Sequence, residues 1–229
     1  MASTALPQRY RVLIALLGSA ILAYAAFVSA KRGLADWSSM QARHEVAIWT
    51  EHRTIPPPAR LQEAINSLIN ALARAPNDPI LIEHLGAALQ LRANAAAPGS
   101  QLRQLALRAA LVYFRKAAAL RPSSPYTWAN ILLVKYHLGQ IDDEFFGATR
   151  NALDLGPWEP AVQLIVADAT LGAWNRLDAA LRTRATENLR RATVRQTAAL
   201  ARIATDQRRV DLICAAAFEE MKSKLKCLR

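Results

Sequence analysis

The sequence predicts an all-α fold: an N-terminal transmembrane helix followed by an antiparallel helical-repeat (α-solenoid) domain. A four-residue segment with proline at both ends occurs three times, at 76–79, 122–125 and 157–160, with an alanine five residues before each leading proline. The last two segments begin 35 residues apart, and the first two begin 46 apart, which is one such period plus an insertion. A recurrence of about 34 residues is typical of stacked helix pairs. Ala- and Leu-rich stretches without alternating β-branched runs also favour helix over strand.

Composition limits the class of protein. The chain has 229 residues, 52% of them apolar, and a formal net charge of +11. This is enough for one domain with a sizeable core and an appendage. Basic charge suits nucleic acid, an anionic membrane surface or an acidic polymer. Because no zinc spacing, stacking-sheet motif or helix-turn-helix pattern accompanies the charge, we expect no nucleic-acid partner.

Residues 12–30 form an uncharged apolar run of 19 residues. As a helix, this length spans a hydrocarbon core of about 30 Å, so we expect a single membrane-spanning helix after a short cytoplasmic tail. Basic residues flank both ends of the run, and the positive-inside rule therefore leaves the orientation open. Val28-Ser29-Ala30 resembles a signal-peptidase site, so cleavage is an alternative, although the run exceeds the usual signal core of about 7–15 residues.

The rest of the chain divides at proline and glycine breaks. Asp78 and Ser124 stand where helix N-caps are expected, each followed by a first-turn proline. Expected helices cover residues 34–53, 61–75, 79–93, 101–120, 125–138, 142–155 and 160–174. The expected organisation is a tail and transmembrane helix at 1–32, an amphipathic helix and Pro-rich connector at 33–60, helical repeats at 61–175 and basic C-terminal capping helices at 176–229.

The two cysteines fall within residues 177–228, a stretch that we expect to form one long helix or two. Cys214 and Cys227 are 13 residues apart, so a continuous helix would hold their Cα atoms about 20 Å apart. A disulfide needs about 4.4–6.8 Å. An intrahelical bridge is therefore excluded unless the helix breaks, and two free thiols are the simpler expectation, with an intermolecular bridge as the alternative.

The repeats resemble tetratricopeptide (TPR) repeats over residues 61–175. The most specific match to the TPR spacing consists of Ala110, Phe114, Ala117, Pro122 and Trp128. The pattern is imperfect, because Ile131-Leu132 replaces the usual Leu-Gly. In such repeats the first helix of each pair lines a groove that receives a partner segment. This register implies a partner groove lined by Glu83, Gln90, Tyr126, Asn130, Tyr136 and Asp168.

A narrower resemblance is carried by RPSSPYTWAN at 121–130, GQIDDEF at 139–145 and GPWEP at 156–160. With the membrane span and a short Trp-containing helix, these segments are similar to the VpsP-type proteins of bacterial exopolysaccharide biosynthesis clusters. The resemblance implies a role at the bacterial inner membrane, with partners among polysaccharide biosynthesis or export components. Because a very short tail before a single span usually stays cytoplasmic, we expect a single-pass protein whose soluble domain is periplasmic. The resemblance transfers no catalytic motif.

Arginine is concentrated in the C-terminal stretch, where two functions suit it. The first function is capping, because the last repeat of a solenoid needs a polar outer surface over its core. The alternative is a binding module for anionic polysaccharide or lipid, with a patch formed by Arg182, Arg184, Arg190, Arg191, Arg195, Arg202, Arg208 and Arg209.

Sequence motifs for chemistry are absent. His44, His52, His84 and His137 are scattered, and the chain has no Cys-x2-Cys spacing and no Gly-rich phosphate loop. The acidic run at 142–144 suits a helix N-terminus. We therefore expect a non-enzymatic scaffold without a metal or cofactor. The remaining alternative is a glycan-modifying enzyme whose paired carboxylates meet only in the fold.

Overall fold

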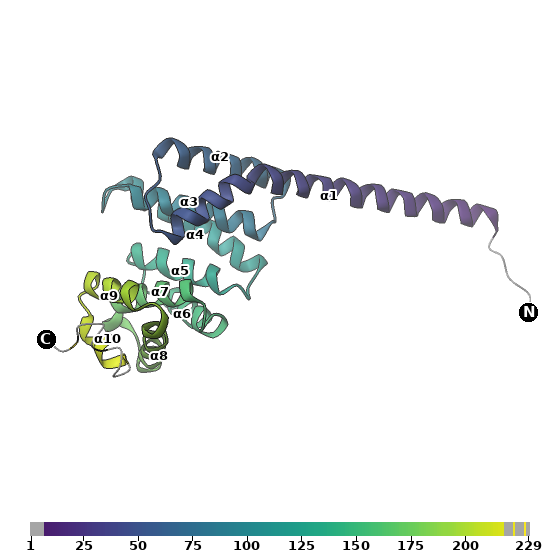
Figure 1. The fold of residues 1–229 in the computed structure, drawn as a ribbon. Coiled ribbons are helices and arrows are strands. Elements are labelled where there is room, and N and C mark those ends of the chain that lie inside the picture. Colours follow the sequence, from purple (N-terminus) through teal and green to yellow (C-terminus); the bar gives the residue numbers. More distant parts are fainter. Residues whose placement is uncertain (1–6, 218–221, 223–226, 228–229) are drawn as a thin grey trace, which may run out of the picture.

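The computed structural model describes residues 7–217, 222 and 227. Within this part the chain forms α-helices and one short 3-10 helix, without strands. The predicted all-α class is therefore confirmed. Figure 1 shows one long helix that projects from the domain; its C-terminal part packs against the next two helices of the chain, and the remaining helices extend the domain away from it.

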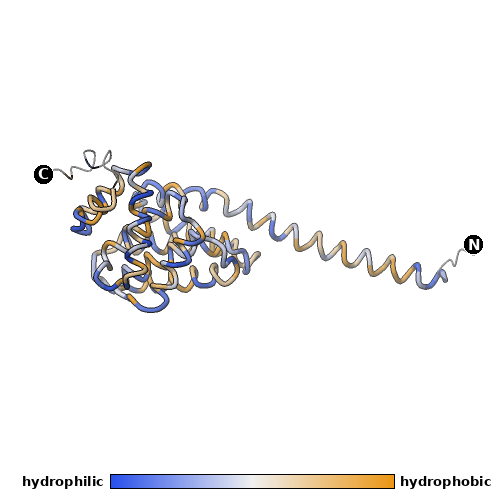
Figure 2. The backbone as a smooth tube through the Cα atoms, turned by 90° about the horizontal axis from the view of Figure 1, so that it is seen from below, coloured by the Kyte–Doolittle hydropathy of each residue, from blue (hydrophilic) through white to orange (hydrophobic). Residues whose placement is uncertain are grey.

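The projecting helix, α1 (Gln8–Glu51), is 44 residues long and runs without a break from the apolar run into the domain. Its apolar 18-residue window is wholly exposed, and in the described residues α1 alone is long and apolar enough to cross a membrane. Figure 2 shows mostly hydrophobic or neutral colours along this projecting part. Its buried residues, Ala35, Ser39, Ala42 and Val46, all lie in the C-terminal half. The expected span at 12–30 and the amphipathic helix expected at 34–53 are thus parts of one continuous helix.

Helices α2 to α7 follow the expected breaks to within a few residues. Neighbours in the chain contact each other, as α1 does with α2, α3 with α4 and α5 with α6, and the alternate helices α5 and α7 also touch. These elements are α2 (Pro58–Arg74), α3 (Pro79–Ala95), α4 (Gln101–Leu120), α5 (Pro125–His137), α6 (Asp143–Leu155) and α7 (Pro160–Gly172).

The three proline segments are junctions at which α3, α5 and α7 begin. Proline occupies the first turn of each, where a missing N–H costs no helix hydrogen bond. The N–H of Ile80 donates to Asp78 Oδ1 at 2.9 Å, and the N–H of Thr127 donates to Ser124 Oγ at 3.4 Å. Glu159 holds the same position before α7, without such a bond. The starts of these helices could therefore be predicted from the sequence, because they depend on local proline and capping residues.

Small residues let the helices approach one another. Ala71, Ala117 and Ala152, which precede the three junctions, have no exposed surface. Gly86 of α3 faces Phe114 of α4 so closely that a Cβ at position 86 would lie 2.8 Å from the ring. The recurrent alanines and this glycine thus mark helix-packing contacts.

The C-terminal region has more breaks than expected. Instead of one or two helices it forms η1 (Trp174–Arg176), α8 (Ala179–Arg195), α9 (Thr197–Asp206) and α10 (Val210–Ala216). Neither proline nor glycine marks the breaks after α8 and α9, and the second contains Arg208 with a positive φ of 55°. Packing explains them, since Leu200, Ile203 and Ile213 join one core cluster with Ala167. Tertiary contacts outweigh the helix-favouring local sequence here.

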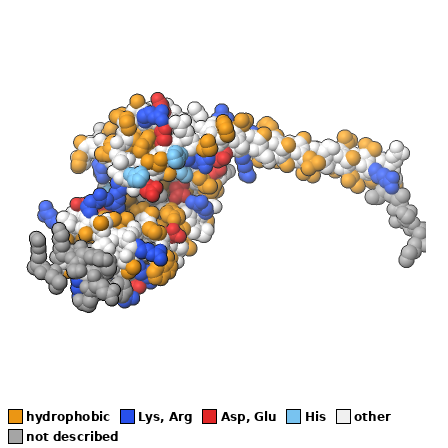
Figure 3. Space-filling model, in the orientation of Figure 1, with side chains coloured by type: hydrophobic (Ala, Val, Ile, Leu, Met, Phe, Trp, Pro, Cys, Tyr) orange, Lys and Arg blue, Asp and Glu red, His pale blue; other side chains and the backbone are white. Residues whose placement is uncertain are grey.

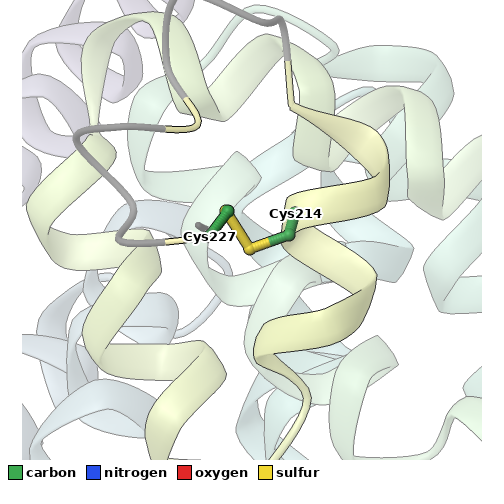
Figure 4. Close-up of a disulfide and its surroundings, with 2 residues drawn as sticks. All are labelled: Cys214 and Cys227. Atoms are coloured by element: carbon green, nitrogen blue, oxygen red, sulfur yellow. A yellow bond between two sulfur atoms is a disulfide. The ribbon is translucent and has the colours of Figure 1, made fainter. Parts of the chain in front are cut away.

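Cys214 and Cys227 form a disulfide (Figure 4). Helix α10 ends at Ala216, and the extended backbone of Ala217 turns the chain away from the helix axis. The helix therefore breaks between the two cysteines, and their Cα atoms come within 5.6 Å. The expectation of two free thiols was wrong, because it assumed a helix that continues past residue 217.

Candidate functional site

A hollow lies between the α3–α4 pair and α5, and acidic, basic and histidine side chains gather along it (Figure 3). The least buried face of α5 carries Tyr126, Asn130 and His137, which spacings of four and seven residues bring onto one side of the helix. The other faces of α5 supply core residues such as Ile131, Leu132 and Val134. We use "the groove" as a name for His137 together with the six residues predicted for the partner groove.

One end of the groove lies beside the second junction. The side chain of Glu83 on α3 is 13% exposed, and Arg121 Nη2 donates to its carboxylate at 2.6 Å. Arg121 also donates to the capping residue Ser124 at 3.1 Å. Gln90, two turns further along α3, is half-buried. This ion pair therefore ties the groove wall to the start of α5.

Tyr126 lies at the same end, with 42% of its surface exposed. Its hydroxyl donates to the carboxylate of Glu159, the residue just before α7. That hydrogen bond, with a smaller effect from burial, raises the pKa of Tyr126 to about 12. Asn130 is half-buried one turn beyond Tyr126 on the same face. The tyrosine thus links two junctions while leaving part of its ring open to a ligand.

The opposite end of the groove is closed by the residue after α9. The Tyr136 hydroxyl donates to Gln207 Oε1 at 2.8 Å, and Gln207 Nε2 donates to Asp168 Oδ1 at 2.8 Å. Gly172 makes room for this tyrosine, since a Cβ there would lie 2.0 Å from its oxygen. Burial raises the pKa of Tyr136. Tyr136 and Asp168, both predicted groove residues, therefore hold the C-terminal helices in place.

Sequence reasoning missed three residues of the site: His137, Arg103 and Gln207. Burial lowers the pKa of His137, the charge of Arg103 lowers it further, and Asp168 opposes them. The imidazole is therefore neutral at neutral pH. Helical spacing from Tyr126 could have identified His137. Nothing local to Gln207, which reaches the site through tertiary packing, could have done so.

The predicted anionic-surface patch does not form one face. On α8, Arg184, Arg191 and Arg195 share a flank, whereas Arg182 and Arg190 lie on another. Arg184 pairs with Asp154 of α6. Arg202 lies on α9, with Arg208 and Arg209 just after it.

The flank formed by Arg184, Arg191 and Arg195 carries a stacked pair. The Arg191 guanidinium carbon lies 4.8 Å from the ring centre of Trp158, in the third junction, and Arg191 Nε donates to Glu187 at 3.1 Å. Trp158 is 67% exposed. This cation–π pair therefore lies on the surface and is not a core contact.

The acidic run before α6 serves the fold. Asp142 Oδ1 accepts from the N–H of Phe145 at 3.1 Å and caps the helix. Lys135, 1% exposed, donates to Asp142 at 2.9 Å and to Glu144 at 2.6 Å. Arg115 donates two hydrogen bonds to the carboxylate of Glu144, at 2.7 and 2.6 Å. The Arg115 bond, opposed by burial and helped by Lys135, lowers the pKa of Glu144 to about 2, so this carboxyl is poorly suited to act as the general acid of a glycosidase.

In the described part of the chain, no three His, Cys, Asp or Glu side chains gather as a metal site. Comparison with known proteins adds no assignment: no protein-family model matches the chain, and no curated protein matches it.

Proposed function

We propose that this chain is a membrane-anchored, TPR-like scaffold that holds a segment of a partner protein in the groove and catalyses no reaction of its own. The observation that carries the proposal is the equivalence of α3, α5 and α7. Each begins at a proline junction and each follows a buried alanine; α3 and α5 carry five of the six predicted groove residues, and α7 carries the sixth, Asp168. Repeated helices with a shared open face are how solenoid proteins build extended binding surfaces.

Helix packing supports the TPR-like arrangement. Paired neighbours such as α3 and α4, together with direct contact between α5 and α7, are expected of stacked helix pairs. The close contact between Gly86 and Phe114 joins α3 to α4, and Phe114 is one of the residues that match the TPR spacing. Helix α8 and the helices after it then act as the cap of the stack, with α9 packed on α7.

The chemistry of the groove favours a peptide. Gln90 and Asn130 carry side-chain amides, which both donate and accept hydrogen bonds and so match a peptide backbone. Glu83 and Asp168 add negative charge, and His137 is neutral. Glu83 is paired with Arg121 and Asp168 accepts from Gln207, so hydrogen bonding by the amides rather than net charge is what suits this surface to an extended protein segment.

We infer the compartment and pathway from other features. The disulfide favours an oxidising compartment, which supports a periplasmic domain. The exposed apolar part of α1 supports single-pass anchoring in the inner membrane. The resemblance to VpsP-type proteins supports a role in exopolysaccharide biosynthesis or export. The alternative, binding of anionic polysaccharide or lipid by the C-terminal arginines, is less well supported because those residues lie on different surfaces.

Site-specific photo-crosslinking in bacteria that make exopolysaccharide tests the proposal. A benzoylphenylalanine replaces Asn130 in the groove of the full-length protein, and the matched control carries it at Val112, a 61% exposed position on α4. We expect a discrete protein adduct from position 130 only, and we expect Tyr126→Ala to reduce its yield. Mass spectrometry then identifies the adduct. Equal adducts from both positions, or none from position 130, would contradict a groove-bound partner, and a partner unrelated to polysaccharide would contradict the pathway.

A further inference from the structure

The three proline junctions lie together along one edge of the domain. Lys116 Nζ, near the end of α4, donates to the carbonyl oxygen of Pro76 in the first junction at 2.8 Å. Gly156 in the third junction lies against Pro125 in the second, where a Cβ would be 2.6 Å from the proline ring. We call this surface "the junction edge": residues 74–79, 116–125 and 155–160, with the end of α8 at 191–195 beside Trp158.

Two contacts fix how this edge stands relative to α1. Ser67 Oγ donates to the carbonyl oxygen of Ser38 at 2.9 Å, and Arg60 pairs with Glu45. Both contacts fit one antiparallel register, in which seven residues forward on α2 correspond to seven residues back on α1. Arg74, the last residue of α2, is therefore about level with residue 31, where the apolar run has just ended. In Figure 1 the α2–α3 connection lies on the side toward which α1 projects.

No linker separates the apolar run of α1 from the domain, so the position of the junction edge relative to that run is fixed. Ala35, the first buried residue of α1, comes four residues after Lys31, which is about 6 Å of helix. The headgroup layer on each side of a bilayer is roughly 5–8 Å thick. If residues 12–30 cross the hydrocarbon core, the domain begins within the headgroup layer, and the edge that contains Arg74 faces it.

The exposed side chains of the junction edge suit a membrane surface. Leu120, Trp158 and Val194 are apolar and 43%, 67% and 57% exposed. Arg74, Lys116 and Arg195 are basic and exposed. The carboxylates of Glu83 and Glu159 nearby are already engaged by Arg121 and Tyr126. Tryptophan is favoured at bilayer interfaces, and basic clusters bind anionic headgroups.

We propose that the junction edge rests on the membrane that α1 crosses, with the headgroups of anionic phospholipids as its ligand. The contact holds α3, α5 and α7 with their N-terminal ends toward the bilayer and presents the side of the helix stack, including the groove, to partners that lie along the membrane. The inference depends on α1 as a membrane anchor but not on which protein occupies the groove.

Spin labels on the full-length protein in nanodiscs test the contact. Single cysteines are introduced as Trp158→Cys and Leu120→Cys on the edge, Asn94→Cys at the far end of α3, and Ala23→Cys in the apolar run; the native cysteines are bonded to each other and do not react. Collision rates with a water-soluble nickel chelate and with oxygen report depth. In discs containing phosphatidylglycerol, we expect both edge labels to lose nickel access relative to the label at 94.

The outcomes distinguish contact of the junction edge with lipid from anchoring by α1. Edge labels as open to nickel as the label at 94, with the label at 23 deep in lipid, would overturn the contact and leave the anchor intact. A label at 23 that is open to nickel would overturn the anchor and the contact together.

A charge-reversal pair identifies the ligand. Arg74→Glu with Arg195→Glu is expected to restore nickel access at position 120 in anionic discs, because both charges face the headgroups. The matched control, Arg202→Glu on α9, is expected to change nothing. If Arg202→Glu alone restores access, the face of α9 that carries Arg202 rather than the junction edge binds the lipid, and the proposal is wrong.

Discussion

Lys135 Nζ lies 2.6 Å from a carboxylate oxygen of Glu144, and the lysine is 1% exposed. A charge removed from water to this extent is stable only when it is paired and hydrogen-bonded. Asp142 supplies the second partner at 2.9 Å, and Arg115 holds Glu144 from the other side. The four residues join α4, α5 and the start of α6, so this network lies between two helix pairs.

Glu144→Gln is therefore expected to destabilise the protein by about 2 kcal/mol. The substitution leaves Lys135 buried with one carboxylate, and the cost stays below that of a fully buried pair because Glu144 is 34% exposed. Urea unfolding in detergent, followed by circular dichroism, measures the effect. The control is Glu187→Gln, which removes exposed pairs on α8 and is expected to change stability by less than about 1 kcal/mol. Equal effects would show that burial of the lysine has no energetic consequence.

Stability is expected to fall as the pH drops from about 4.5 to about 2. Glu144 has its pKa lowered from 4.5 to about 2 in the folded state, so it contributes stability above its unfolded pKa and loses it as the folded pKa is approached. Asp142, whose pKa is also lowered, acts in the same direction. Unfolding free energies measured across this range for wild type and Glu144→Gln give the test. The variant must show a shallower loss, and parallel curves would refute the assignment.

Gly172→Ala is expected to destabilise the protein by about 1–3 kcal/mol. A Cβ at position 172 would lie 2.0 Å from the Tyr136 oxygen, and the displaced ring would lose its bond to Gln207. Gly147→Ala is the matched control: it is also helical, nothing lies within 4 Å of its Cβ, and we expect it to stabilise by about 0.5–1 kcal/mol. Thermal unfolding distinguishes the two, and a neutral Gly172→Ala would show that Tyr136 relaxes freely.

Cys214→Ser is expected to cost about 2–3 kcal/mol, because the disulfide closes a loop of 13 residues. Thiol titration of the denatured, unreduced protein must find no free thiol in the wild type and one in the variant. Cys227→Ser is the matched variant and must give the same loss. Two titratable thiols in wild type purified without reductant would contradict the bond.

The parts of the fold that the sequence predicted are those with local causes. First-turn prolines mark the starts of α3, α5 and α7. At the first two of these helices the side chains of Asp78 and Ser124 also cap the N-terminus, and both signals are local in the sequence. The end of α9 has no such signal: Arg208 adopts a left-handed conformation that its neighbours, not its own preference, impose. The disulfide was missed for the same reason, since it depends on where α10 stops.

In the candidate site, too, the predictable residues are those placed by local helical spacing. Tyr126 and Asn130 are related by helical spacing, so their shared face follows from the register. Gln207, which closes the groove, lies 71 residues from Tyr136 in the chain. That the predicted arginine patch is divided among different surfaces could likewise not be predicted without the position of α8. Arg184 pairs with Asp154 because α8 packs against α6.

Helix α1 is continuous from its apolar run into the domain, so no linker would separate the domain from a membrane that residues 12–30 cross. Each residue inserted between Arg32 and Ala35 would rotate the domain by about 100° around the helix axis and raise it by about 1.5 Å. Seven inserted alanines would nearly restore the facing direction while lifting the domain about 10 Å from the bilayer. If α1 crosses a membrane, the orientation and height of the domain above the bilayer are therefore set by helix phase and length, and a tilt or rotation of α1 would turn the groove with it.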